Sequence, residues 1–158
     1  MPAYYRALLD EFLADDSERI LGVLAAESAK SGFADLKQKQ TKAWQKQIDA
    51  LKAACFSLQN QFTDSANWGV LLEYPIPRRQ KRIDAVLLAR HVIFCFEFKT
   101  EDKTYSGHLK RQVEDYALDL REFHDVSRSS PIIPVAVALG APPVNPIPYA
   151  ATSDLVRP

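Results

Sequence analysis

Three charged residues stand inside or directly beside apolar segments of this sequence. Asp84 lies within residues 83–88, Glu97 lies near the end of residues 92–98, and Lys99 directly follows that segment. Both segments are short and rich in β-branched and aromatic residues, which is typical of buried strands. Because only three residues separate them, the two segments predict a β-hairpin.

The expected register of this hairpin brings the charged residues together. If Arg90 and His91 form the turn, Ala89 faces Val92, and counting back along both strands places Asp84 opposite Glu97. Directly opposed residues project from the same side of a sheet with Cβ atoms roughly 5 Å apart. Lys99, two residues beyond Glu97, shares that side. Arg-His is unfavourable in a two-residue turn, so a longer loop with a one-residue slip is the alternative.

Two carboxylates at this separation repel each other and resist joint ionisation. A divalent cation removes the conflict, and hard cations take oxygen ligands. The alternative is a set of ion pairs at a strand end, Glu97 with Lys99 or Asp84 with Arg82. The spacing of Asp84, Glu97 and Lys99 taken together favours a metal site.

Two neighbouring features could extend such a site. Glu73 lies near the end of a further predicted strand, residues 68–74, where it is either a third carboxylate ligand or the partner of a nearby arginine. The following prolines exclude a regular ladder over residues 75–82 and predict a loop. Its basic residues suit phosphate oxygens, although most charge runs are solvated loops. They are Arg78, Arg79, Lys81 and Arg82.

A helix is predicted over residues 108–123, with Ser106 as its cap. His108, Gln112 and Tyr116 recur every four residues and therefore share one edge of it. Gln112 could bind a metal-coordinated water or a phosphate, whereas Tyr116 could position Lys99 or be a core aromatic residue. Lys110 adds positive charge on the neighbouring face.

The motif Asp84…Glu97-Phe98-Lys99, followed by Gln112 and Tyr116, resembles the D…ExK and QxxxY motifs of the PD-(D/E)xK nuclease superfamily. The similarity covers about half of the chain. The longer segments around both strands most resemble the nuclease-like domain that precedes a superfamily 1 helicase in some bacterial proteins. This resemblance implies a metal held by Asp84, Glu97 and the carbonyl of Phe98, and a fused helicase domain that this chain does not contain. The helix that carries a metal-binding glutamate in many members has only Gln45, Gln47 and Asp49 here.

The remaining pattern predicts an α/β fold in the order helix–strand–strand–strand–helix–strand. The resemblance implies the same order, as a restriction-endonuclease-like core. The core, residues 41–141, contains a mixed sheet of about four strands. A helix over residues 41–59 precedes the strands, and residues 131–139 form the last one. Residues 1–40 are expected to form an extra helical pair, over 4–13 and 18–29, with Ser17 capping the second. Residues 142–158 read as a proline-rich closing segment or linker.

The composition is that of an ordinary globular chain, with 158 residues, 47% apolar, and 20 basic residues balancing 20 acidic ones. A zero net charge argues against non-specific wrapping of nucleic acid but allows a local basic patch. Cys55 and Cys95 lie in apolar surroundings, which fits reduced thiols and a cytoplasmic location. The sequence shows no signal peptide and no membrane-spanning stretch.

The favoured hypothesis is a nuclease that uses Mg²⁺, with Mn²⁺ able to substitute, on DNA in preference to RNA. Asp84, Glu97, Lys99 and Gln112 would form its catalytic site. The nucleic acid would contact Arg78, Arg79, Lys81, Arg82, Lys110 and Tyr116. Two alternatives remain, an inactive nucleic-acid-binding or docking module that guides a helicase, and a protein-interaction domain that uses the amino-terminal helices. A homodimer is compatible with all three.

Overall fold

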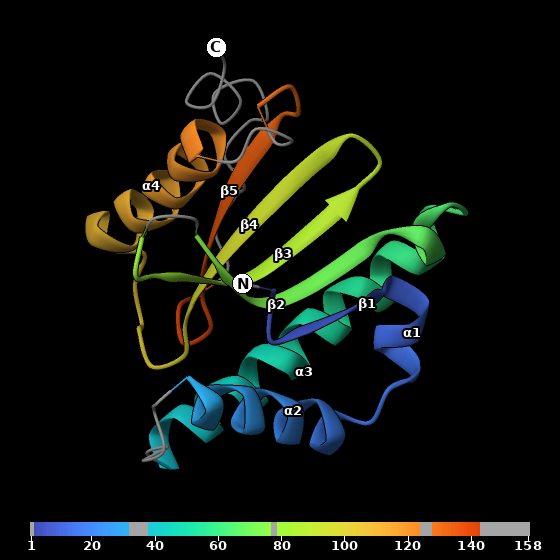
Figure 1. Ribbon diagram of the computed structural model, residues 1–158. Coiled ribbons are helices and arrows are strands. Elements are labelled where there is room, and N and C mark those ends of the chain that lie inside the picture. The colour runs from blue at the N-terminus through green and yellow to red at the C-terminus, as the bar shows by residue number, and fades with distance from the viewer. Residues whose placement is uncertain (1, 32–37, 77–78, 124–127, 143–158) are drawn as a thin grey trace.

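A five-stranded mixed sheet forms the centre of the molecule (Figure 1). The computed structural model describes residues 2–31, 38–76, 79–123 and 128–142. The strands lie in the order β1-β2-β3-β4-β5, and only the β4–β5 pair is parallel. Their bounds are β1 (Tyr5–Leu8), β2 (Gly69–Pro75), β3 (Arg82–Ala89), β4 (Val92–Lys99) and β5 (Ile132–Ala138). The α/β class is therefore confirmed, with five strands in place of about four.

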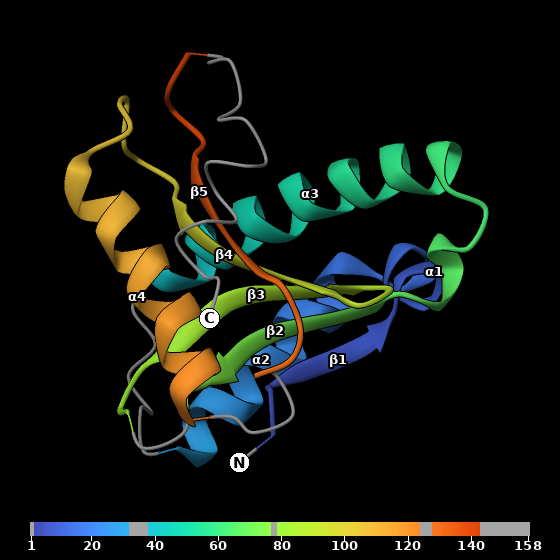
Figure 2. The same cartoon turned by 90° about the horizontal axis from the view of Figure 1, so that it is seen from above.

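Helices cover both faces of the sheet (Figure 2). On one face, the main core contains buried residues of α1 (Leu9–Ala14), α2 (Ser17–Lys30) and α3 (Gln38–Gln61). On the other face, α4 (Gly107–Phe123) packs against a second core. One side of α4 is buried along its length: Leu109, Val113, Tyr116, Ala117 and Leu120. A short 3₁₀ helix, η1 (Ser65–Asn67), leads into β2. Within the described ranges, no helix combines the length and the hydropathy that a bilayer crossing needs.

The first predicted helix, residues 4–13, is wrong over its first half. Tyr5–Leu8 is an edge strand that pairs antiparallel with β2, and the helix begins only at Leu9. In this strand Tyr5 is buried and Ala7 packs against the core, whereas Arg6 and Leu8 are exposed, which is the two-residue alternation of a strand. The second helix has the expected position, but Asp16 and not Ser17 is its cap.

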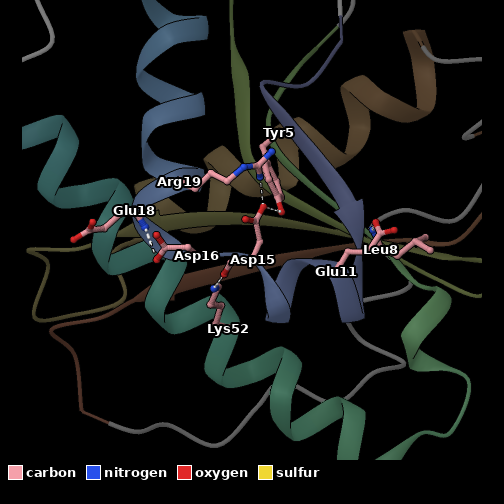
Figure 3. A network of polar contacts seen from close by, with 8 residues as sticks. All are labelled: Tyr5, Leu8, Glu11, Asp15, Asp16, Glu18, Arg19 and Lys52. Atoms are coloured by element: carbon pink, nitrogen blue, oxygen red, sulfur yellow. Dashed lines mark hydrogen bonds and ion pairs between the residues drawn. The ribbon is translucent and has the colours of Figure 1, made fainter.

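Asp15 joins this amino-terminal segment to the helices (Figure 3). Its carboxylate accepts a hydrogen bond of 2.9 Å from the hydroxyl of Tyr5 and forms an ion pair of 2.5 Å with Arg19 of α2. Its backbone carbonyl accepts a hydrogen bond from Lys52 of α3. Through these contacts β1, α2 and α3 are held in one arrangement on the sheet.

The predicted hairpin register is confirmed. Ala89 pairs with Val92, so Arg90 and His91 form a two-residue turn despite their unfavourable residue types. Arg90 adopts a φ of 58°, which a side chain disfavours. The guanidinium of Arg90 compensates through two hydrogen bonds, of 2.7 and 2.8 Å, to the carboxylate of Asp64.

Candidate functional site

Asp84 and Glu97 lie on adjacent strands at one end of the sheet. The β3–β4 ladder pairs Ala85 with Phe96, and the same register one residue further opposes Asp84 and Glu97. Asp84 Oδ2 accepts a hydrogen bond of 2.8 Å from the backbone N–H of Phe98. The structure thus brings together the two carboxylates that the sequence placed opposite each other.

The carboxyl groups of Asp84 and Glu97 are difficult to ionise at the same time. Burial raises the pKa of Asp84 well above its usual range, and the negative charge of Glu97 raises it further. Burial also raises the pKa of Glu97, which is only 4% exposed, although the charge of Lys99 counteracts this effect. The pair therefore tends to retain a proton unless a further positive charge is supplied.

Lys99 supplies part of this positive charge. Its Nζ lies 3.4 Å from Glu97 Oε1, and its side chain is 35% exposed. The Glu97–Lys99 ion pair, which the sequence offered as the alternative to a metal site, is therefore present. Arg82, by contrast, donates a hydrogen bond of 3.0 Å to the backbone carbonyl of Glu73.

Gln112 connects α4 to the carboxylate pair. Its Nε2 donates hydrogen bonds of 2.8 Å to Glu97 Oε1 and to the hydroxyl of Tyr116. Tyr116 is buried, and burial raises its pKa to about 12, so it approaches the site through Gln112 as a neutral phenol. Glu97 Oε2 and Gln112 Oε1 are buried without a hydrogen-bond partner among the described residues. Each of these oxygen atoms can accept a hydrogen bond from a water or contact a cation.

Glu73 lies in β2 between two regular pairs of the β2–β3 ladder, Leu72–Ala85 and Tyr74–Ile83. Its Oε1 accepts a hydrogen bond of 2.9 Å from the indole N–H of Trp44. Burial, assisted by the charge of nearby Asp84, raises the pKa of Glu73 to about 7. Over the described part of the chain, no group of three or more His, Cys, Asp or Glu side chains is arranged to hold a metal ion.

Some of the predicted phosphate-binding residues contact other side chains of the protein, and others are exposed. Arg79 forms an ion pair of 3.1 Å with Asp119 of α4, and the guanidinium of Arg82 lies 3.9 Å from the ring centre of Tyr4. Lys81, in the loop before β3, is exposed. Lys110, in the first turn of α4, is exposed as well. Arg78 lies outside the described residues.

Trp44 is the site neighbour that the sequence did not reveal. It lies on α3 and is 3% exposed. A buried indole N–H usually requires a hydrogen-bond partner, so the sequence could indicate that Trp44 has one. It could not indicate that the partner is Glu73, which lies 29 residues away.

Comparison with protein-family models, with curated proteins and with solved structures finds no match for this chain.

Proposed function

We propose that this protein is a metal-dependent nuclease that hydrolyses phosphodiester bonds in DNA or RNA. The observation that carries the proposal is the Asp84–Glu97 pair, in which Glu97 is buried and Asp84 is half-buried, with Lys99 beside it. A buried charged cluster costs stability, so a purely structural role gives little reason for its presence. A reaction at a phosphate requires oxygen ligands for a cation and a positive charge nearby, and these residues supply both.

The residues present fit a hard divalent cation such as Mg²⁺ or Mn²⁺. Two carboxylates with raised pKa values gain stability from an added positive charge, and Glu97 Oε2 has no partner among the described residues. Asp84, Glu97 and the backbone carbonyl of Phe98 would hold the ion. When bound, the ion supplies charge neutralisation at the phosphate and activation of water.

Lys99 and Gln112 complete the proposed chemistry. The partly exposed ammonium of Lys99 can face the scissile phosphate, where it holds the attacking water or exchanges a proton with it at Nζ. Gln112 fixes the orientation of Glu97 by its hydrogen bond to Oε1. The exposed Lys81 and Lys110 offer charge for the backbone of the nucleic acid.

A cleavage survey tests this proposal. Labelled single- and double-stranded DNA and RNA are incubated with the purified protein and Mg²⁺ or Mn²⁺. We expect at least one substrate to be cleaved and EDTA to stop the reaction. Cleavage that persists in EDTA would exclude the metal mechanism, and absence of cleavage on all four substrates would exclude the activity for this chain.

The second candidate is an inactive docking or nucleic-acid-binding module, such as one attached to a helicase. It is favoured by the absence of a three-carboxylate metal group among the described residues and by the intramolecular ion pair of Arg79. Binding of nucleic acid without cleavage, unchanged by EDTA, is the result expected for this module.

A further inference from the structure

A small cavity lies between α3 and the end of the sheet that carries Asp84. Its volume is about 10 Å³, close to the minimum that one water molecule needs. Most of its lining is apolar, but three of the lining residues carry amide or carboxyl groups: Gln47, Glu73 and Asp84. The ring of Trp44 lines it as well. At this cavity α3 and β2 approach Asp84.

Glu73 reaches the cavity through an unusual backbone conformation. Its φ is 52°, in the left-handed region that side chains disfavour, although it lies within strand β2. Two hydrogen bonds stabilise this conformation, one from Trp44 to Oε1 and one from Arg82 to the backbone carbonyl. Strain of this kind persists only where the surroundings enforce it, and it is concentrated at functional sites.

An independent observation indicates that a ligand belongs next to this arrangement. Glu97, opposite Asp84, is 4% exposed, and its Oε2 has no hydrogen-bond partner within the described ranges. Such a buried carboxylate oxygen, beside a second carboxylate, can bind a cation or accept a hydrogen bond from a water that a cation holds.

We propose that Trp44 and Glu73 are a positioning pair for the divalent cation held by Asp84 and Glu97. The indole N–H of Trp44 directs the carboxylate of Glu73 toward the cavity, where it accepts a hydrogen bond from a water that the cation coordinates. This inference rests on the proposed function. It accounts for the missing glutamate of α3, because the helix contributes an indole that orients a carboxylate from β2. It also agrees with the lack of a three-carboxylate group among the described residues, since Glu73 acts through water.

Calorimetric titration with Mg²⁺ tests this positioning role. Trp44→Phe removes the N–H while it keeps an aromatic ring, and we expect Mg²⁺ affinity to fall about tenfold, as for other residues that orient metal ligands. Trp68→Phe is the matched control, because the indole of Trp68 also donates to a carboxylate, Asp64, but at the opposite end of the sheet. Its Mg²⁺ affinity should equal that of the wild type.

Glu73→Gln provides the second variant, which decides the question if Trp44→Phe fails to fold. It retains an acceptor for Trp44 but loses the charge, and we expect a similar tenfold loss. Adding Trp44→Phe to Glu73→Gln should cause little further loss, because both act through one hydrogen bond. If both single variants bind Mg²⁺ with wild-type affinity, the positioning role of Trp44 and Glu73 is wrong, and the proposed function is unaffected. A wild type that binds no Mg²⁺ would overturn the metal site of the proposed function as well.

Discussion

Gln112 Nε2 lies 2.8 Å from Glu97 Oε1 and ties helix α4 to the buried carboxylate of β4. The same nitrogen contacts the hydroxyl of Tyr116 one turn later on the helix. The helix thereby fixes the position of one member of the carboxylate pair, and the strand ladder fixes the other.

The first prediction concerns this contact. Gln112→Leu leaves Glu97 without its amide donor, so we expect the free energy of unfolding to fall by about 1–3 kcal/mol. Urea unfolding at pH 7 measures the change. Gln45→Leu is the control, because Gln45 also donates to a carboxylate, Asp49, but on the exposed side of α3. The control should change stability by less than about 0.5 kcal/mol; equal losses would show that Gln112 has no special role.

The second prediction concerns pH. The pKa of Glu73 is raised from 4.5 to about 7, so the folded protein holds this proton more tightly than the unfolded chain. The contribution of Glu73 to the stability of the metal-free protein therefore falls as pH rises from about 4.5 to 7, by an amount on the order of 3 kcal/mol. Glu73→Gln cannot ionise, and its stability relative to the wild type should increase across this window. Urea unfolding in EDTA at pH 5 and pH 8 measures the difference.

Glu122→Gln serves as the control for this pH experiment, because Glu122 is an exposed glutamate of α4. The free energy of unfolding of this variant should equal that of the wild type at both pH values. If Glu73→Gln also follows the wild type, Glu73 does not carry the raised pKa.

The third prediction is a conflict between stability and metal binding at Asp84. Asp84→Asn removes one of two repelling carboxylates but keeps an acceptor for the N–H of Phe98. In EDTA at pH 8 we expect the variant to be more stable than the wild type by about 1–2 kcal/mol, roughly 4 °C in Tm. Added Mg²⁺ should raise the Tm of the wild type and leave that of the variant unchanged.

Asp115→Asn, at an exposed position of α4, is the control for Asp84 and should respond to Mg²⁺ like the wild type. A variant at Asp84 that is destabilised in EDTA, or that Mg²⁺ still stabilises, would contradict the assignment of Asp84 as a metal ligand.

The parts of this structure that the sequence predicted correctly are those that depend on local pattern. Counting along the two strands was sufficient to oppose Asp84 and Glu97, because a hairpin with a short turn has few possible registers. Strand β1 was missed because Tyr5, Leu9 and Phe12 also fit a helical stripe, and only pairing with β2 makes Tyr5–Leu8 a strand.

The contact between Trp44 and Glu73 could not be predicted for a related reason. It joins residues that are 29 positions apart, and it depends on the left-handed φ of Glu73. Nothing in the local sequence around Glu73 requires this conformation, since non-glycine residues rarely adopt it. Likewise, the turn at Arg90 is stabilised by Asp64, which is distant in sequence.

The most direct test of the proposed nuclease is a comparison of cleavage rates in Mg²⁺ for the wild type, Asp84→Asn, Lys99→Met and the control Asp115→Asn. We predict cleavage by the wild type and the control, and a loss of at least about a hundredfold in the other two variants. Equal cleavage by all four proteins would show that the activity arises elsewhere and would contradict the proposed site. Cleavage by none of them, with nucleic-acid binding retained, would contradict the nuclease and support the docking module.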